Sequence, residues 1–508
     1  GKTTLTEKFL LFGGAINTAG SVKGKANSKY AVSDWMDIEK ERGISVTSSV
    51  LQFNYDGYCI NILDTPGHQD FSEDTYRTLM AADSAVMVID ASKGVEAQTI
   101  KLFKVCVMRH IPIFTFINKM DRDARDTFEL LDDIETVLGI KTCPVNWPIG
   151  SGKEFKGVYD RKTKIVSTFQ AISTGGAKKA EETDYHIDDE ALKELVGPYL
   201  FDQFNEEIEL IDGATEEMDI EKVRAGELSP VFFGSALNTF GIEQFLNYFL
   251  KMTTPPIGRN SSEGIIDPVT EPFSAFVFKI QANMNKAHRD RIAFMRICSG
   301  KFEAGMEVYH AASKRKIKLS QPQQLMAQDR KIVDEAYAGD VIGVFDPDLF
   351  SIGDTLTTGG KKFEYEGIPT FAPEHFCRVV QLNSMKRKQF VKGVTQIAQE
   401  GAIQIFQEYT AGLSEIIVGV VGVLQFDVLK YRLENEYGCE IRLEPIPYNY
   451  IRWVKDPTID VTKLKRVSDV KKVKDMKGNP LLLFANEWVI DQVLQHNEGL
   501  ELEEFRKN

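Results

Sequence analysis

The chain has 508 residues, a net charge of -13, and the apolar and charged fractions of an ordinary globular protein. This length exceeds one hydrophobic core and predicts three domains, while the lack of any run of 18 or more apolar residues excludes insertion into a membrane. The acidic balance argues against a protein that coats nucleic acid by charge, so we expect no DNA partner, although one domain could still carry a basic face.

The six cysteines are scattered along the chain without any C-x-x-C pair: Cys59, Cys106, Cys143, Cys298, Cys377 and Cys439. This spacing fits reduced thiols in a cytoplasmic protein better than a disulfide framework or a zinc site. We therefore expect a cytoplasmic protein without redox chemistry, and we expect it to be a monomer.

The sequence opens inside a nucleotide-binding motif. A P-loop has the pattern G-x-x-x-x-G-K-[ST] after a buried strand, and Gly1-Lys2-Thr3-Thr4 matches only its end. We expect a strand and about five loop residues to precede Gly1 in the native protein. The apolar residues Leu5, Phe9 and Phe12 then follow at helical spacing, and Gly13-Gly14 ends the helix.

Strands and helices alternate after this helix. Residues 49–55 and 58–63 predict two strands joined by Asp56-Gly57, a hairpin that ends in Asp64. Next we expect a helix from about Ser72 to Ala82. A strand at residues 85–89, a helix at 95–109 and a strand at 111–117 follow it. This alternation predicts an α/β P-loop domain with a doubly wound, mostly parallel sheet.

The stretch from Asp121 to Ser235 is much longer than the roughly 30 residues of one strand-helix-strand step. It predicts an insertion at about residues 140–228, with a small β region at 157–169 and an acidic helical region at 188–221. A linker rich in Pro, Gly and Ser covers residues 253–264. We therefore place the first domain at residues 1–260.

Two further domains follow the linker. Runs rich in Val, Ile and Phe at residues 273–280, 292–298 and 341–344 alternate with Gly-containing turns, which predicts an antiparallel β-barrel over residues 265–370. Residues 371–508 show a mixed pattern, with a strand at 416–423, a helix at 424–437 and a final helix around 488–495. This pattern predicts an α+β domain.

The first two motifs carry the chemistry of a triphosphate site. A glycine loop that leads into a helix start offers backbone N–H groups and a favourable dipole, Lys2 supplies a countercharge, and the Thr3 hydroxyl is placed to ligate Mg²⁺. In Asp64-Thr65-Pro66-Gly67-His68, the carboxylate at the strand end suits the magnesium shell, and Gly67 lets its N–H approach the γ-phosphate. Taken alone, each motif could also be a plain helix start or a solvated turn.

The other two motifs predict a guanine site. Asn118-Lys119-Met120-Asp121 follows a predicted strand, at the carboxyl end of the sheet, where ligands bind. The carboxylate of Asp121 can accept from the N1–H and the amine of guanine, a donor pair that adenine lacks. Asn118 and Lys119 would brace the loop and cover the base, while Ser235-Ala236-Leu237 could offer an N–H to the guanine O6. The expected cofactors are GTP or GDP and Mg²⁺.

Taken together, these motifs resemble those of the translational GTPases. Arg42-Gly43-Ile44-Ser45-Val46-Thr47 resembles the switch I sequence of this family, which implies that Thr47 ligates magnesium in the GTP state and that Val46 forms one side of an apolar gate. His68 matches the histidine of switch II. The resemblance implies that His68 is catalytic, positions the attacking water, and acts when the ribosome orders the site.

Within that family, the chain resembles the bacterial class II peptide chain release factors, which are GTPases. The resemblance rests on residues 33–36, 71–77, 278–284, 288–291 and 420–426, and on a chain that stops where elongation factor G and the tetracycline-resistance proteins carry further domains. It implies a ribosome-activated GTPase that drives class I release factors from the ribosome after peptide release. The ribosome and class I release factors are then the expected partners.

Other interpretations stay open at this point. One is a ribosome-protection or elongation-type GTPase, and another is a GTP-gated module that binds the ribosome and hydrolyses GTP incidentally. A P-loop kinase or ATPase is disfavoured by Asp121. The basic stretches at residues 314–318, 386–388 and 463–477 are candidate RNA contacts or ordinary solvated faces, since no aromatic residues are interleaved for stacking.

Overall fold

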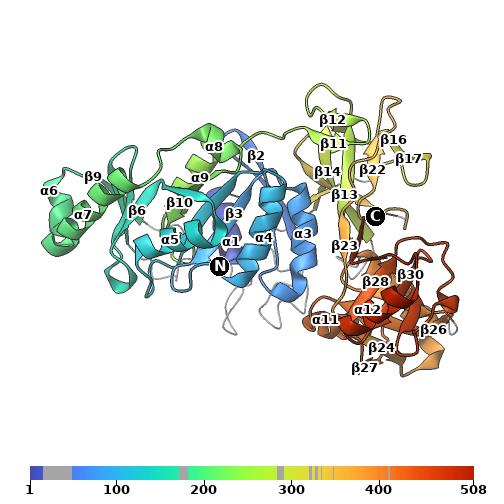
Figure 1. The fold of residues 1–508 in the computed structure, drawn as a ribbon. Helices are drawn as coiled ribbons and strands as arrows, with labels where there is room; N and C mark the ends of the chain where they lie inside the picture. Colours follow the sequence, from blue (N-terminus) through green and yellow to red (C-terminus); the bar gives the residue numbers. More distant parts are fainter. Residues whose placement is uncertain are drawn as a thin grey trace.

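The computed structural model describes residues 1–14, 48–170, 181–282, 291–319, 323–325, 330–332, 334–346, 348–409 and 412–507. Figure 1 shows three bodies: a first domain with a long extension to the left, a β-rich domain at the upper right, and a mixed domain below it. We call them the first domain, the barrel domain and the third domain. The first runs from α1 to α9, the barrel domain from β11 to β22, and the third domain from β23 to β32.

The first domain is built on a parallel sheet with the strand order β3-β4-β10-β5. These strands span Ala85–Asp90, Ile113–Asn118, Leu228–Phe233 and Lys141–Pro144. Strands β4 and β10 are buried along their whole length, as expected for strands covered on both faces. The prediction of a mostly parallel, doubly wound sheet is therefore confirmed.

Helices cover both faces of this sheet. Helices α1 (Lys2–Phe12) and α9 (Ile242–Met252) pack on one face, where Phe9 stacks on Phe245. The other face carries α4 (Ala97–Met108) and α5 (Thr127–Leu138). The register aligns Asp90 with Asn118, so the last residues of β3 and β4 lie side by side at the carboxyl edge.

The predicted hairpin is confirmed as β1 (Ser49–Tyr55) and β2 (Tyr58–Asp64). Its turn residues Asp56 and Gly57 both have positive φ, the combination that a type I′ turn requires. Within the described residues, the hairpin forms its own two-stranded sheet. A groove of about 920 Å³ is lined by residues of α1, β2, β3 and α9 and by residues 337–341.

The extension at the left of Figure 1 combines a small sheet with helices. Its antiparallel strands are β6 (Asn146–Ile149), β7 (Gly157–Asp160), β8 (Ile165–Gln170) and β9 (Glu181–His186). Its helices are α6 (Glu190–Val196) and α7 (Pro198–Ala214), whereas α8 (Ile220–Arg224) packs against β10 and α9 beside the main sheet. The buried Trp147 joins the two parts, because its Nε1 donates to Glu207 Oε2 at 2.8 Å.

The barrel domain is an antiparallel sheet with the strand order β17-β16-β22-β13-β14-β21-β18-β19, as the β-barrel prediction requires. Residues 259–264, expected to be linker, instead belong to the hairpin β11–β12, which joins the domain through a bridge from Ser261 to Tyr365. A hairpin of such short strands has no apolar alternation that a sequence could show. The strands are Arg259–Ser261 (β11), Gly264–Ile266 (β12), Ser274–Ala282 (β13), Arg291–Ser299 (β14), Lys301–Glu303 (β15), Glu307–His310 (β16), Arg315–Lys318 (β17), Gln323–Leu325 (β18), Arg330–Ile332 (β19), Glu335–Tyr337 (β20), Val341–Phe345 (β21) and Thr355–Thr357 (β22).

The third domain has the predicted α+β character. Its large sheet has the order β27-β24-β26-β25-β29-β30-β28-β31, and separate apolar cores lie under the helices and between the strands. The helices are Arg387–Gln399 (α10), Leu424–Glu436 (α11) and Glu487–His496 (α12). The strands are Pro369–Phe371 (β23), His375–Gln381 (β24), Gln404–Glu408 (β25), Gly412–Val420 (β26), Ile441–Pro445 (β27), Tyr450–Val454 (β28), Lys471–Lys474 (β29), Pro480–Phe484 (β30), Leu502–Glu503 (β31) and Phe505–Lys507 (β32).

Helix α3 (Ser72–Ala81) lies where the three domains meet. Arginines from other elements bind the carbonyl groups at its carboxyl end: Arg109 donates to the oxygens of Leu79 and Ala82, Arg259 to that of Met80, and Arg296 to that of Ala81. Arg259 and Arg296 belong to the barrel domain. Cations at a helix carboxyl end satisfy free carbonyls and oppose the helix dipole, so these contacts fasten the barrel to the first domain.

A buried ion pair joins the barrel domain to the third domain. Glu400 accepts hydrogen bonds from the backbone N–H of Ala282 and the amide of Gln281 in β13. Its carboxylate also pairs with Arg432 of α11, and Arg432 binds Glu436 one turn further along at 3.0 Å. Both members of the central pair are almost fully buried. The carboxylates raise the pKa of Arg432 against the opposing effect of its burial.

Replacing Arg432 with leucine should lower the free energy of unfolding of the third domain by about 3–5 kcal/mol, because two carboxylates would lose their buried partner. Equilibrium urea unfolding measures this change. The matched control is Arg442→Leu, since Arg442 forms an exposed pair with Glu444 and should contribute about 0–1 kcal/mol. Equal effects of the two substitutions would contradict the assignment of a buried junction pair.

Candidate functional site

The first and second motifs meet at the start of α1. Lys2 Nζ donates to the carbonyl oxygen of Pro66 at 3.1 Å, and a Cβ placed on Gly67 would lie 3.8 Å from Lys2 Cε. The helix follows Gly1 without a side-chain cap, and the amino end of a helix is a favourable place for an anion. The residues that the sequence assigns to phosphate binding are thus brought together.

Oxygen ligands suited to a hard cation lie beside this lysine. The side chains of Thr3 and Asp64 are both buried, one on the first turn of α1 and the other on the last residue of β2. Burial lowers the pKa of Lys2, and the Asp64 carboxylate opposes that shift. Lys2 and Asp64 therefore place one positive and one negative charge at close range.

His68 lies immediately after this pair of motifs, at the start of the short helix η1 (Gln69–Phe71). Its Nδ1 accepts a hydrogen bond from the backbone N–H of Asp70 at 3.1 Å, so in the neutral ring Nε2 is the nitrogen that carries the proton. The His68 side chain is 43% exposed and its ring packs edge-on to Phe71. This exposure suits a side chain that acts on water brought to the surface.

The third and fourth motifs are held together by one buried amide. Asn118 Oδ1 accepts from the backbone N–H of Lys119 and from that of Ala236, each at 2.8 Å. Backbone hydrogen bonds between Ser235 and Phe240 close the second loop in both directions. Asn118 thus performs the bracing that the sequence predicts for it, and the side chain of Leu237 is left at the surface.

An ion pair orients the side chain of Lys119, and a hydrogen bond from an amide orients that of Asp121. Lys119 has a positive φ of 69°, and its Nζ donates to Asp90 Oδ2 at 2.7 Å. Burial raises the pKa of Asp90, but the hydrogen bonds from Lys119 and Ser92 outweigh it and bring the pKa down to about 2. Asp121 Oδ2 accepts from Asn238 Nδ2 at 2.6 Å.

The structure adds three residues that sequence reasoning missed: Asp70, Asp90 and Asn238. Asp90 could have been found, because it ends a buried strand next to the one that carries Asn118. Asn238 directly follows the fourth motif in the chain. Nothing in the sequence indicates the role of Asp70, because its partner outside the site is more than 350 residues away.

Some predicted site residues lie outside the described part of the chain. Thr47 and Val46, with the rest of residues 15–47, are among them, as are residues 283–290, which contribute to the family resemblance. The assignment of Thr47 as a magnesium ligand therefore stays a prediction.

Three families match consecutive parts of the chain. The Elongation factor Tu GTP binding domain matches residues 1–255, Elongation factor G domain 2 matches residues 272–359, and the Class II release factor RF3 C-terminal domain matches residues 365–494.

Relatives with the name peptide chain release factor 3 align over almost the entire chain. The protein of Symbiobacterium thermophilum is 56% identical and the alignment covers 98% of this chain and 94% of that protein. The protein of Synechococcus elongatus is 53% identical, with 99% and 90% covered, and that of Gloeobacter violaceus is 52% identical, with 99% and 95% covered.

A solved structure shares the fold. The crystal structure of ttk003000868 from Thermus thermophilus superposes with a TM-score of 0.70, covering 94% of this chain and 70% of the other, at 21% sequence identity. At that identity the similarity bears on the fold alone.

Asp90→Ala should weaken the binding of a guanine nucleotide by about threefold to tenfold, because Lys119 loses the charged hydrogen bond that orients it. Fluorescence titration with a labelled guanine nucleotide measures this. Since the pKa of Asp90 is lowered to about 2, its contribution is fully present above about pH 4 and is lost only as the pH falls toward 2. Asp188→Ala, at an exposed carboxylate of the extension, is the control and should leave the affinity unchanged.

Proposed function

The chain belongs to the peptide chain release factor 3 family of class II release factors, and on that basis we propose that it removes class I release factors from the ribosome by hydrolysing GTP. It is a GTPase of translation termination that the ribosome stimulates. The match of residues 365–494 to the release factor C-terminal domain argues against the elongation-type and ribosome-protection alternatives.

One observation carries the proposal: both halves of a nucleotide site lie in the first domain. Lys2 contacts the loop that contains Gly67, and Asn118 joins the two guanine loops through its amide oxygen. In the proposed complex, the first turn of α1 and Lys2 bind the phosphates. Asp121 accepts two hydrogen bonds from guanine, Asn118 and Lys119 brace the loop and cover the base, and residues 235–237 offer a backbone N–H to the guanine O6.

We further propose that Mg²⁺ is held by Thr3 and Asp64, with Thr47 as a third ligand in the GTP state. The hydroxyl and carboxylate oxygens fit a hard cation, and both described side chains are buried beside Lys2. No cluster of three His, Cys, Asp or Glu side chains occurs among the described residues, and a magnesium ion shared with phosphate oxygens needs none. When bound, the ion would neutralise negative charge that develops on the phosphates.

His68 is the proposed catalytic residue. Its Nδ1 is engaged by the N–H of Asp70, so the proton resides on Nε2 whenever the ring is neutral, and the side chain is partly exposed. A ring fixed in this way can orient a water molecule toward the γ-phosphate. Loss of that phosphate would release the Gly67 loop and shift the population of domain arrangements.

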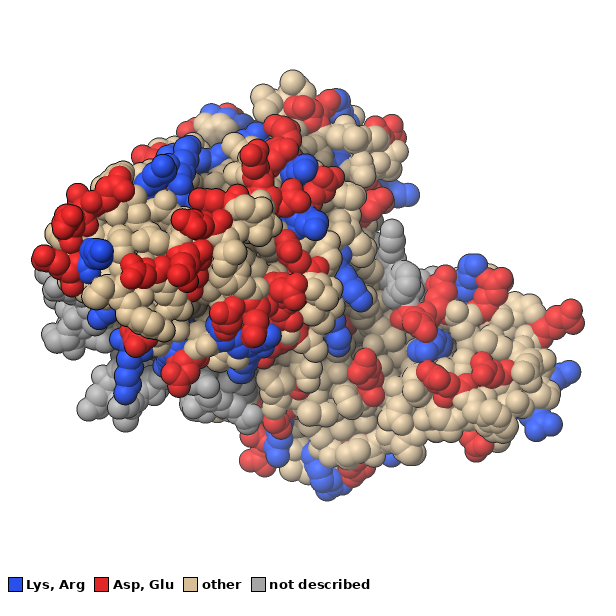
Figure 2. Space-filling view, turned by 60° about the vertical axis from the view of Figure 1, so that its left-hand side comes forward, with Lys and Arg blue, Asp and Glu red and all other residues tan. Residues whose placement is uncertain are grey.

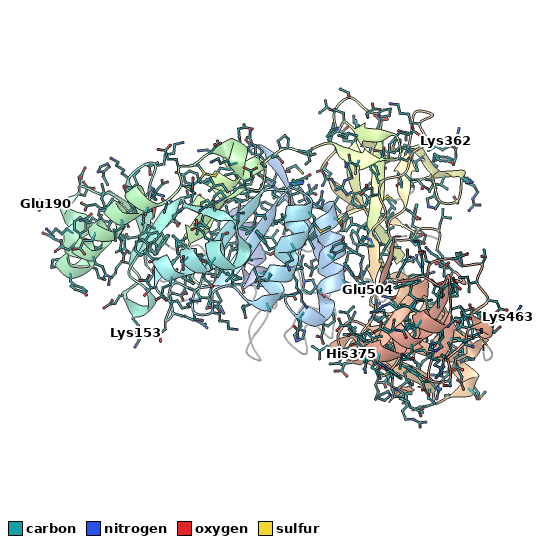
Figure 3. All side chains as sticks on the ribbon, viewed as in Figure 1. Lys153, Glu190, Lys362, His375, Lys463 and Glu504 are labelled. Carbon is teal, nitrogen blue, oxygen red and sulfur yellow. The ribbon has the colours of Figure 1, made fainter. Side chains whose placement is uncertain are left out.

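The proposal places the protein in the cytoplasm as a monomer, with the ribosome and class I release factors as partners and no DNA partner. No helix among the described residues has the length and apolar character needed to span a membrane. Figure 2 shows Asp and Glu side chains interleaved with Lys and Arg on the visible face. Figure 3 places Lys463, from one of the predicted basic stretches, on the outer side of the third domain, where a large partner has access.

His68→Ala should lower ribosome-stimulated GTP hydrolysis by about a hundredfold or more while the affinity for GTP stays unchanged, because the substitution removes only the water-orienting group. Phosphate release under single-turnover conditions measures the rate, and nucleotide titration measures the affinity. His186→Ala, on strand β9 of the extension, serves as the control. A His68→Ala protein that recycles class I factor through many rounds would refute the hydrolytic switch.

The protein with GTP should accelerate the departure of a class I factor from stop-codon ribosomes after peptide release. Fluorescently labelled class I factor reports its own dissociation, and a non-hydrolysable GTP analogue separates binding from hydrolysis. We expect the analogue to permit displacement but to stop turnover, because the protein then stays on the ribosome. No acceleration with either nucleotide would exclude the release-factor function.

A further inference from the structure

The turn that carries His68 is bound directly by the third domain. Asp70 lies two residues after His68, and its Oδ2 accepts a hydrogen bond from the backbone N–H of Leu424 at 2.9 Å. Leu424 is the first residue of α11, and that helix has no side-chain cap of its own at the preceding residue. Asp70 therefore acts as the amino-terminal cap of a helix in another domain, where the helix dipole favours its negative charge.

The contact is tight on the side of the third domain. A Cβ added to Gly422 would lie only 2.2 Å from the Cβ and Cγ atoms of Asp70 and 2.4 Å from its Cα. Such a separation is far below van der Waals contact, so only glycine permits this approach. The loop around Gly422 is itself fixed, because Gln425 Oε1 accepts from the N–H groups of Val421 and Gly422, each at 3.0 Å.

The same residue holds the histidine. The backbone N–H of Asp70 donates to His68 Nδ1, while its carboxylate binds the α11 amide. A continuous path of two hydrogen bonds thus runs from the third domain through Asp70 to the imidazole ring. Displacement of α11 would move Asp70, and the ring would lose the donor that fixes its orientation and tautomer.

We propose that Asp70 and Gly422 are positioning residues for GTP hydrolysis, through which the third domain sets the orientation of His68. The inference rests on the proposed catalytic role of His68. The third domain then takes part in hydrolysis without touching the nucleotide: only when α11 is docked on the Asp70 turn is the imidazole held for catalysis.

A neighbouring contact supports the docking but does not reach the histidine. Arg77 of α3 donates to the carbonyl oxygen of Gly401 in the third domain at 3.2 Å. Its loss should loosen the same interface without changing the bond between Asp70 and His68. Arg77→Ala therefore distinguishes weakened docking from loss of the path through Asp70.

The test compares single-turnover GTP hydrolysis on saturating ribosomes for the parent protein and for Asp70→Ala, Asp70→Asn and Gly422→Ala. We expect Asp70→Ala and Gly422→Ala each to lower the hydrolysis rate by about tenfold or more, with the affinities for GTP and ribosomes unchanged. Asp70→Asn keeps an acceptor for the α11 amide and should remain within about threefold of the parent. Arg77→Ala should lower the rate by less than Asp70→Ala does.

The double variant Asp70→Ala/Gly422→Ala should be no slower than the slower single variant, within about twofold, because both substitutions break one path. Gly213→Ala adds a methyl group at an open position of α7 and controls for the glycine substitution. Thermal unfolding of each variant shows whether the chain still folds. Parent-like hydrolysis by Asp70→Ala would overturn the inference, as would full additivity in the double variant.

Including His68→Ala separates this inference from the proposed function. If His68→Ala hydrolyses GTP at the parental rate, the catalytic role of His68 fails and the inference fails with it. If His68→Ala is slow while Asp70→Ala is as fast as the parent, His68 keeps its role and only the path through Asp70 is refuted.

Discussion

Helix α3 and the turn before it are bound at both ends by the other two domains. At the carboxyl end, Arg259 and Arg296 of the barrel domain donate to the last carbonyl groups, where the helix dipole favours cations. Before the amino end, Asp70 caps α11 of the third domain. Because this segment begins beside Gly67, any movement at the γ-phosphate position must either carry the other domains along or break these contacts.

The two halves of the nucleotide site differ in how they are supported. The guanine half stands on buried parallel strands, and the amide of Asn118 locks its two loops. The phosphate half is completed by residues after β2, which belong to a separate two-stranded hairpin. Rigid recognition of the base can therefore coexist with a phosphate loop whose position depends on its surroundings, which a nucleotide switch requires.

Local patterns predicted much of the fold because local chemistry decides those elements. The residues Asp56-Gly57 specify their own turn, and the helices predicted at residues 72–82 and 424–437 match the observed α3 and α11 closely. The prediction missed α10 and took residues 259–264, which belong to the hairpin β11–β12, for linker. The hairpin is tied to the barrel domain by the bridge from Ser261 to Tyr365, and α10 buries its apolar face in a core of the third domain.

The sequence by itself determined the four nucleotide motifs, their order and the family, because each motif needs particular residue types within a few positions. Thr47 lies outside the described residues, so its assignment as a magnesium ligand rests on the sequence alone. Only the tertiary structure decided which residues support the motifs. Asp90 reaches Lys119 across adjacent strands, Glu400 joins two domains, and Asp70 meets the helix of residues 424–436. The physical reason is that a hydrogen bond depends on distance in space, and chain folding brings together groups whose separation in sequence carries no pattern.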